Sequence, residues 1–238
     1  MKKQSRFKFI SIILFGFLFA ISDCGPSDPS REYDSSVTEF GIPKNSLPFY
    51  KGKDLQPVWL DTTESSSTKQ LRRISPFRMT NQLGETIGDF SLKGNLSVIS
   101  FFFTHCSGIC PTITNNLKRV QETYFKDKQV RMFSFSVTPD LDTPWELKLY
   151  AEKRNIKKEF WHLLTGSKSE IYQMARESFN ADTITPGEKK KGIGPNDFLH
   201  SESVYLLDQN LRVRGIYNGR NSVSIGELIA DIKILQKE

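Results

Sequence analysis

The run Leu96–Phe103 constrains the fold of this chain more than any other segment. Its residues are aliphatic or aromatic apart from Ser97 and Ser100. A nearly continuous apolar run of this length predicts a central strand that is buried on both faces. Such a strand needs helices packed on each side of its sheet, so this segment favours an α/β domain.

The segments after this run alternate between helix and strand patterns, and two short extended segments precede it. Helices are predicted from Cys106 or Pro111 to Tyr124 and over 144–154, 167–179 and 224–236, and strands over 74–79, 86–92, 130–137, 160–164, 203–207 and 212–217. The strand over 74–79 is expected at a sheet edge because it contains Pro76. This order predicts a three-layer α/β/α domain with a mixed central sheet and an N-terminal β extension.

The N-terminus has the layout of an export signal. Residues 1–8 carry four basic side chains, and residues 9–21 are almost entirely apolar, which is short for a membrane-spanning helix. Residues 21–24 resemble a bacterial lipobox, in which Cys24 becomes the lipidated first residue of the mature protein. We therefore expect a signal over 1–23 and a protein that is tethered to a membrane and faces the periplasm or the cell exterior. An uncleaved anchor and plain secretion are the alternatives.

Composition separates a linker from the folded domain. Residues 24–70 are rich in Pro, Ser, Asp and Gly, which predicts a tether, and residues 71–238 form the expected domain.

The formal net charge is +6, and the leader contributes half of it. Because Lys and Arg do not cluster beyond Lys189–Lys191, we expect no nucleic-acid partner.

The three cysteines divide into Cys24 and a pair, Cys106 and Cys110, where the buried strand leads into the first helix. Residues four apart are neighbours on a helix surface, and a helix N-terminus lowers the pKa of a thiol. Thiolates are nucleophiles in disulfide exchange and soft ligands for copper(I). The spacing alone does not separate a redox pair, which could form a Cys106–Cys110 disulfide outside the cytoplasm, from a metal site.

The three histidines are the candidates for a third ligand. His105 adjoins Cys106, but consecutive helical residues point in different directions, so a local hydrogen-bonding role is favoured. His162 lies inside a predicted strand and is interpreted as a partly buried structural residue. His200 follows a long polar loop and precedes a strand, a position from which an imidazole can reach the thiol turn.

Taken together, several stretches resemble the Sco/SenC family of copper chaperones. They are Phe103–Pro111, Ser136–Pro144, Leu164–Gly166, and His200 followed by Val204–Asp208. The resemblance runs from about Ile74 to the C-terminus and implies a thioredoxin-like fold. It also implies one copper ion held by Cys106, Cys110 and His200. The family usually has Asp where Thr138 stands and commonly Asp where Leu199 stands, and neither position supplies a ligand.

The resemblance implies delivery of copper to the binuclear copper site of cytochrome c oxidase, or to another cuproenzyme, during assembly outside the cytoplasm. Copper loading requires reduced cysteines, so it excludes the Cys106–Cys110 disulfide. The alternative is a thiol–disulfide oxidoreductase, for which Cys106 and Cys110 are catalytic and His200 is dispensable. A peroxidase of the same fold is a third, weaker hypothesis. The loop over 180–198 leads to His200 and is expected to shift when copper binds.

Overall fold

A computed structural model describes residues 46–60, 70–181 and 201–238 of the chain. These residues belong to one of the two compact units into which the chain divides, that of residues 36–238. Cys24, His200, the predicted leader and most of the loop over 180–198 lie outside the described residues. Within the described ranges, none of the helices is both long enough and apolar enough to span a membrane.

The described elements follow the predicted alternation from the central strand onward. The strands are β1 (Phe49–Lys51), β2 (Gln56–Val58), β3 (Arg78–Asn81), β4 (Thr86–Gly88), β5 (Leu96–Phe102), β6 (Val130–Ser136), β7 (Trp161–Thr165), β8 (Ser203–Leu207) and β9 (Val213–Asn218). The helices are α1 (Asp89–Leu92), α2 (Cys110–Tyr124), α3 (Pro144–Lys153), α4 (Lys168–Phe179) and α5 (Ser222–Leu235).

Seven strands form one mixed sheet in the order β4-β3-β7-β6-β5-β8-β9. The three central neighbours β5, β6 and β7 are parallel, and the other pairs in the sheet are antiparallel. All seven residues of β5 are buried, as its apolar run predicted. The carboxyl ends of β5 and β6 therefore lie side by side, and the segments that follow them meet at one edge of the sheet.

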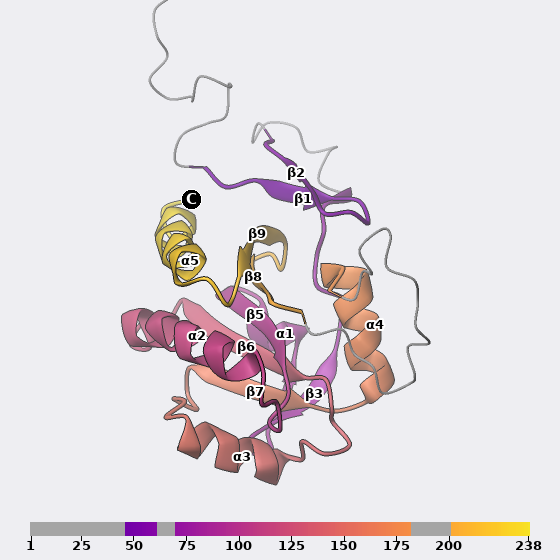
Figure 1. The fold of residues 1–238 in the computed structure, drawn as a ribbon. Helices are drawn as coiled ribbons and strands as arrows, with labels where there is room; N and C mark the ends of the chain where they lie inside the picture. Colours follow the sequence, from indigo (N-terminus) through magenta and orange to yellow (C-terminus); the bar gives the residue numbers. More distant parts are fainter. Residues whose placement is uncertain (1–45, 61–69, 182–200) are drawn as a thin grey trace, which may run out of the picture. The chain divides into compact units, whose positions relative to one another are not determined.

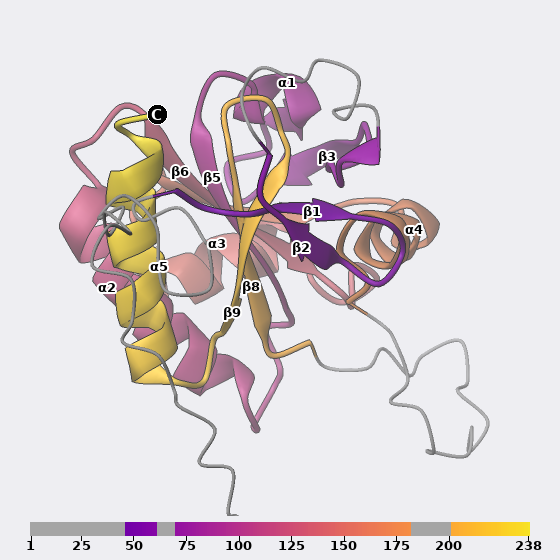
Figure 2. The same ribbon diagram turned by 90° about the horizontal axis from the view of Figure 1, so that it is seen from above.

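Helices cover both faces of this sheet (Figures 1 and 2). Helices α2, α3 and α5 pack on one face through a core that includes Leu117, Leu147 and Leu228. Helix α4 packs on the opposite face through a second core that includes Ile171 and Phe179. The predicted three-layer α/β/α architecture with a mixed sheet is confirmed.

An antiparallel hairpin, β1–β2, lies inside the segment that the composition marked as a linker. The buried guanidinium of Arg214 on β9 anchors it, donating to the carbonyl oxygens of Leu47 and Pro48 at 2.9 and 3.1 Å. The same guanidinium lies 4.0 Å from the centroid of the Phe49 ring and 2.7 Å from a carboxylate oxygen of Glu238. Long-range contacts thus order residues whose local sequence favours a loop.

Two local predictions upstream of β5 are wrong. The predicted edge strand over 74–79 begins only at Arg78, beyond Pro76, and the resulting β3 pairs with β4 on one side and β7 on the other. The extended segment predicted over 86–92 is divided between β4 and the short helix α1. In α1 the Ser91 hydroxyl accepts a hydrogen bond from the Gly88 N–H, which supports a helical turn where a strand was expected.

Candidate functional site

The two thiols lie in and after the turn that joins β5 to α2, at the carboxyl edge of the parallel strands. Cys106 stands in the turn and is half-buried, whereas Cys110 is the first residue of α2 and is 5% exposed. Both are free thiols. The helix begins at Cys110, one residue before the later of the two predicted starts, so the two thiols do not share a helical face. A non-helical turn brings Cys106 to the helix N-terminus instead.

Cys106 is the more acidic thiol. Burial alone would raise its pKa, but hydrogen bonds from the Cys110 thiol and from backbone N–H groups of residues 108–110 outweigh burial and lower the pKa of Cys106. Ile109 and Cys110 are the N-cap and the first residue of α2, so no carbonyl of the helix can accept a hydrogen bond from their N–H groups. The first turn of α2 thus stabilises a thiolate at Cys106.

Cys110 has the opposite character. Burial and the hydrogen bond that its thiol donates to Cys106 raise the pKa of Cys110 to about 12. The pair therefore consists of a partly exposed thiolate and a buried protonated thiol. This asymmetry suits two kinds of chemistry, which are nucleophilic attack on a disulfide by Cys106 and binding of a soft metal ion with release of the Cys110 proton.

A buried carboxylate, Asp142, ties the thiol turn to the neighbouring strand. It is 0% exposed and accepts hydrogen bonds from the backbone N–H and the hydroxyl of Thr104, at 3.2 and 2.5 Å. It also accepts hydrogen bonds from the hydroxyls of Ser136 and Thr138, at 2.5 and 3.1 Å. Sequence analysis did not identify Asp142 as a site residue. The usable signal was the pair of hydroxyl residues Thr104 and Thr138, which follow the buried strands β5 and β6.

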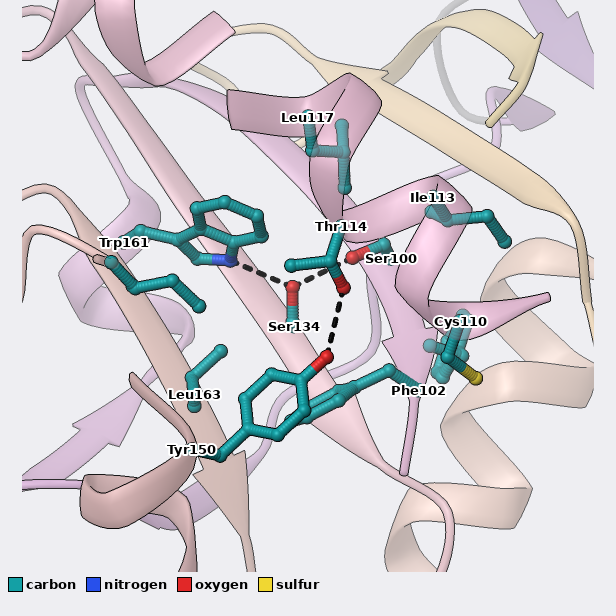
Figure 3. A pocket seen from close by; sticks show the side chains of 12 residues that line it. Ser100, Phe102, Cys110, Ile113, Thr114, Leu117, Ser134, Tyr150, Trp161 and Leu163 are labelled. Carbon is teal, nitrogen blue, oxygen red and sulfur yellow. Dashed lines mark hydrogen bonds between the residues drawn. The ribbon is translucent and has the colours of Figure 1, made fainter. Parts of the chain in front are cut away.

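Behind Cys110 lies a small cavity of about 10 Å³. Two hydrogen-bonded groups line it, namely Thr114 with Tyr150, 3.0 Å apart, and Ser134 with both Ser100 and Trp161, at 2.7 and 2.8 Å. Figure 3 shows the Cys110 sulfur directed away from the Thr114–Tyr150 hydrogen bond. These polar groups satisfy one another, so they form a hydrogen-bonded inner side of the thiol site from which the Cys110 sulfur points away.

The two described histidines differ in their relation to the thiols. His105 is 66% exposed, and its Nδ1 lies 2.9 Å from the Thr104 hydroxyl, beside Cys106. His162 is the second residue of β7 and pairs with Phe133 in the middle of β6, away from the thiol turn. It stacks on Phe133 with ring centroids 5.3 Å apart, and burial lowers its pKa. The surroundings of His162 are those of a structural residue.

The third predicted ligand, His200, lies outside the described residues, and so does Cys24. The residue after His200 is described: Ser201 lines a second cavity of about 10 Å³ together with Ile109 and Cys110. Among the residues that the structure describes, no group of three or more His, Cys, Asp or Glu side chains is arranged to hold a metal ion. The described residues thus supply two sulfur ligands. The residue that leads into β8, Ser201, lies beside one of them, Cys110.

A sequence model of the SCO1/SenC family matches residues 65–236 of this chain. The fold is similar to the crystal structure of a SCO1/SenC family lipoprotein from Bacillus anthracis, with 34% identity, a TM-score of 0.60, and coverage of 69% of this chain and 95% of the other. It is also similar to BsSco, whose structure identified a disulfide switch in a member of the Sco family of cytochrome c oxidase assembly proteins. The identity is 33% and the TM-score 0.59, and the match covers 70% of this chain and 94% of BsSco. A third similar structure is that of Bradyrhizobium japonicum ScoI with copper bound. The identity is 29% and the TM-score 0.53, and the match covers 68% of this chain and 98% of the other. The family model covers most of the chain, and the chain belongs to the SCO1/SenC family.

Proposed function

We propose that this protein is a copper chaperone that binds one copper ion and delivers it to the binuclear copper site of cytochrome c oxidase during assembly. The observation that carries the proposal is the asymmetric pair of free thiols, Cys106 and Cys110, at the helix N-terminus. A relative of this fold, ScoI of Bradyrhizobium japonicum, has been solved with copper bound. BsSco belongs to a family of oxidase assembly proteins.

Copper is the cargo, held by the sulfur atoms of Cys106 and Cys110 and by an imidazole nitrogen of His200. Two thiolates and an imidazole suit copper(I), and a further weak ligand would accommodate copper(II). The position of Ser201 supports His200 as the third ligand, because that neighbouring residue lines a cavity with Cys110. Strand β8 is antiparallel to β5, so its start lies near the end of β5 that leads into the thiol turn.

Delivery would proceed by ligand exchange. A thiolate of the recipient binds the copper ion and displaces the more exposed sulfur, Cys106, before it displaces the buried one, Cys110. Reprotonation of Cys110, whose pKa burial raises to about 12, then favours release of the ion. The low exposure of Cys110 therefore makes it the last sulfur to leave.

A copper titration of the reduced chain tests this function. We expect one equivalent of copper(I) for the parent chain, and weaker binding for Cys110→Ser and His200→Ala. Cys24→Ser is the matched control, since it removes a thiol that the proposal does not use, and its copper stoichiometry should stay the same. Unchanged affinity in both ligand variants would reject the assignment.

A second candidate, thiol–disulfide oxidoreductase, is favoured by the acidity of Cys106 next to a protonated Cys110. The Cys106 thiolate would attack a client disulfide and release one client thiolate. Cys110 would then attack the mixed disulfide, release the second client thiolate, and leave the pair oxidised. His200→Ala discriminates the two functions, because it should weaken copper binding and leave disulfide reduction intact.

We further propose that the chain is exported and tethered to the membrane through lipidated Cys24. The similar Bacillus anthracis protein is described as a lipoprotein. Mass spectrometry of the mature chain tests this proposal. A lipid-modified N-terminal Cys24 is expected in the membrane fraction, and Cys24→Ser should abolish the modification. An unmodified mature chain would contradict it.

A further inference from the structure

A chain of hydrogen bonds runs from the buried Asp142 carboxylate to the imidazole beside Cys106. Every polar contact that Asp142 makes with Thr104, Ser136 and Thr138 comes from a group that can donate a proton. An ionised carboxylate accepts hydrogen bonds and donates none. The four contacts are therefore all satisfied with Asp142 as the acceptor.

The Thr104 hydroxyl is the middle of this chain, and it has one proton to donate. Its oxygen lies 2.5 Å from Asp142 Oδ1 and 2.9 Å from His105 Nδ1. Donation to the carboxylate is favoured because a hydrogen bond to an ionised acceptor is the stronger of the two. The hydroxyl oxygen can then only accept from Nδ1, so the proton of the neutral imidazole sits on Nδ1.

This arrangement leaves His105 Nε2 with a free lone pair. The His105 side chain is 66% exposed and precedes the half-buried Cys106 in the chain, whereas Cys110 is buried. A neutral imidazole nitrogen is a common ligand for copper. An ion that arrives from solvent would therefore meet Nε2 and the Cys106 sulfur before it reaches Cys110.

We propose that Asp142 and Thr104 are positioning residues that hold His105 in the Nδ1–H tautomer, and that His105 Nε2 is the receiving ligand for incoming copper. The identity of the ion rests on the proposed function, but the tautomer does not. Nε2 binds and releases the ion as a neutral donor, so no proton moves at that atom. His105 hands the ion to Cys106 and Cys110 and keeps no place in the final ligand set.

The tautomer is tested by ¹⁵N NMR of the full chain, reduced, metal-free and in detergent, at about pH 8, above the ordinary imidazole pKa. The His105→Asn variant identifies the His105 signals. In the parent chain Nδ1 should give the signal of a protonated ring nitrogen and Nε2 that of a bare one. In Asp142→Asn the amide donates to Thr104, whose proton turns to Nδ1, so the two signals should exchange.

Thr138→Val is the matched control, because it removes another hydrogen bond to Asp142 without touching Thr104 or His105. Its imidazole signals should match those of the parent chain. If Asp142→Asn does not fold, Thr104→Val removes the relaying hydroxyl and should lose the Nδ1–H preference. A parent chain with the proton on Nε2, or a folded Asp142→Asn with unchanged signals, would overturn the tautomer assignment.

Stopped-flow transfer of copper(I) from a coloured bicinchoninate complex tests the receiving role. We expect His105→Asn to load copper several-fold more slowly with unchanged final stoichiometry, because the variant lacks the nitrogen atom that first binds the ion. His162→Asn, which changes a residue paired with the middle of β6, should load at the parent rate. Equal rates for His105→Asn and the parent chain would refute the receiving role. A parent chain that binds no copper would instead refute the proposed function and leave the tautomer result standing.

Discussion

Replacing Cys110 by Ala tests how the structure makes Cys106 reactive. The Cys106 thiolate accepts hydrogen bonds from the Cys110 thiol and from backbone N–H groups of residues 108–110. The substitution deletes the thiol donor and leaves the backbone donors in place. A hydrogen bond to a charged group contributes about 1.5–3 kcal/mol, and a weak S–H donor belongs at the lower end. Since 1.36 kcal/mol is a factor of ten in protonation, the Cys106 thiolate should bind its proton about tenfold more tightly in the variant.

The assay is the rate of iodoacetamide alkylation of Cys106, followed by mass spectrometry against pH in a reduced, metal-free Cys24→Ser background. Cys110→Ala should react up to about tenfold more slowly at neutral pH and approach the parent rate at high pH, where Cys106 is ionised in both chains. Cys110→Ser keeps an O–H donor and should stay close to the parent rate. The parent chain should gain its first label at Cys106, because burial raises the pKa of Cys110 to about 12. An unchanged or faster rate for Cys110→Ala would refute the reasoning.

Three further predictions concern stability. Arg214→Met removes a buried cation that is 3% exposed and should lower the free energy of unfolding by about 3 kcal/mol, measured by urea denaturation; no loss would show that the hairpin anchor is dispensable. Burial lowers the pKa of His162 in the folded state, so the unfolded state binds the proton more tightly and stability should fall as pH drops below about 6.5. His162→Asn should flatten that part of the pH profile, and an equally steep decline in this variant would contradict the assignment. Gly215→Ala would place a Cβ atom 2.1 Å from the Tyr217 hydroxyl oxygen and should cost about 1–3 kcal/mol, whereas the control Gly226→Ala, whose nearest contact is 3.8 Å, should stabilise α5 slightly.

The sequence was sufficient to predict the fold from Leu96 onward because each element there has its own signal. The buried run of β5 and the apolar spacing of the helices are local patterns that the packed sheet preserves. The hairpin β1–β2 has no such signal, since its strands are three residues long and depend on Arg214, more than 150 residues away in the chain. The second pairing of β3 likewise depends on β7, a strand that is distant in the sequence.

For the site, the sequence predicted the position of the thiol pair but not how it is held. Cys106 lies outside the helix because α2 begins at Cys110, a boundary that helix periodicity does not define to the residue. Asp142 was missed because its partners come from two other segments, the turn after β5 and the end of β6, and only the folded chain brings them together. Assignment of His200 and Cys24 rests on the sequence resemblance, since both lie outside the described residues.

X-ray absorption spectroscopy at the copper edge of the copper(I)-loaded chain tests the central claim most directly, because it counts the sulfur and nitrogen atoms bound to the ion. The proposed site predicts two sulfur ligands and one nitrogen ligand. His200→Ala should lose the nitrogen ligand, and His105→Asn should keep it. A copper site with no nitrogen ligand in the parent chain, or one whose nitrogen survives in His200→Ala, would contradict the assignment of Cys106, Cys110 and His200 as the copper ligands.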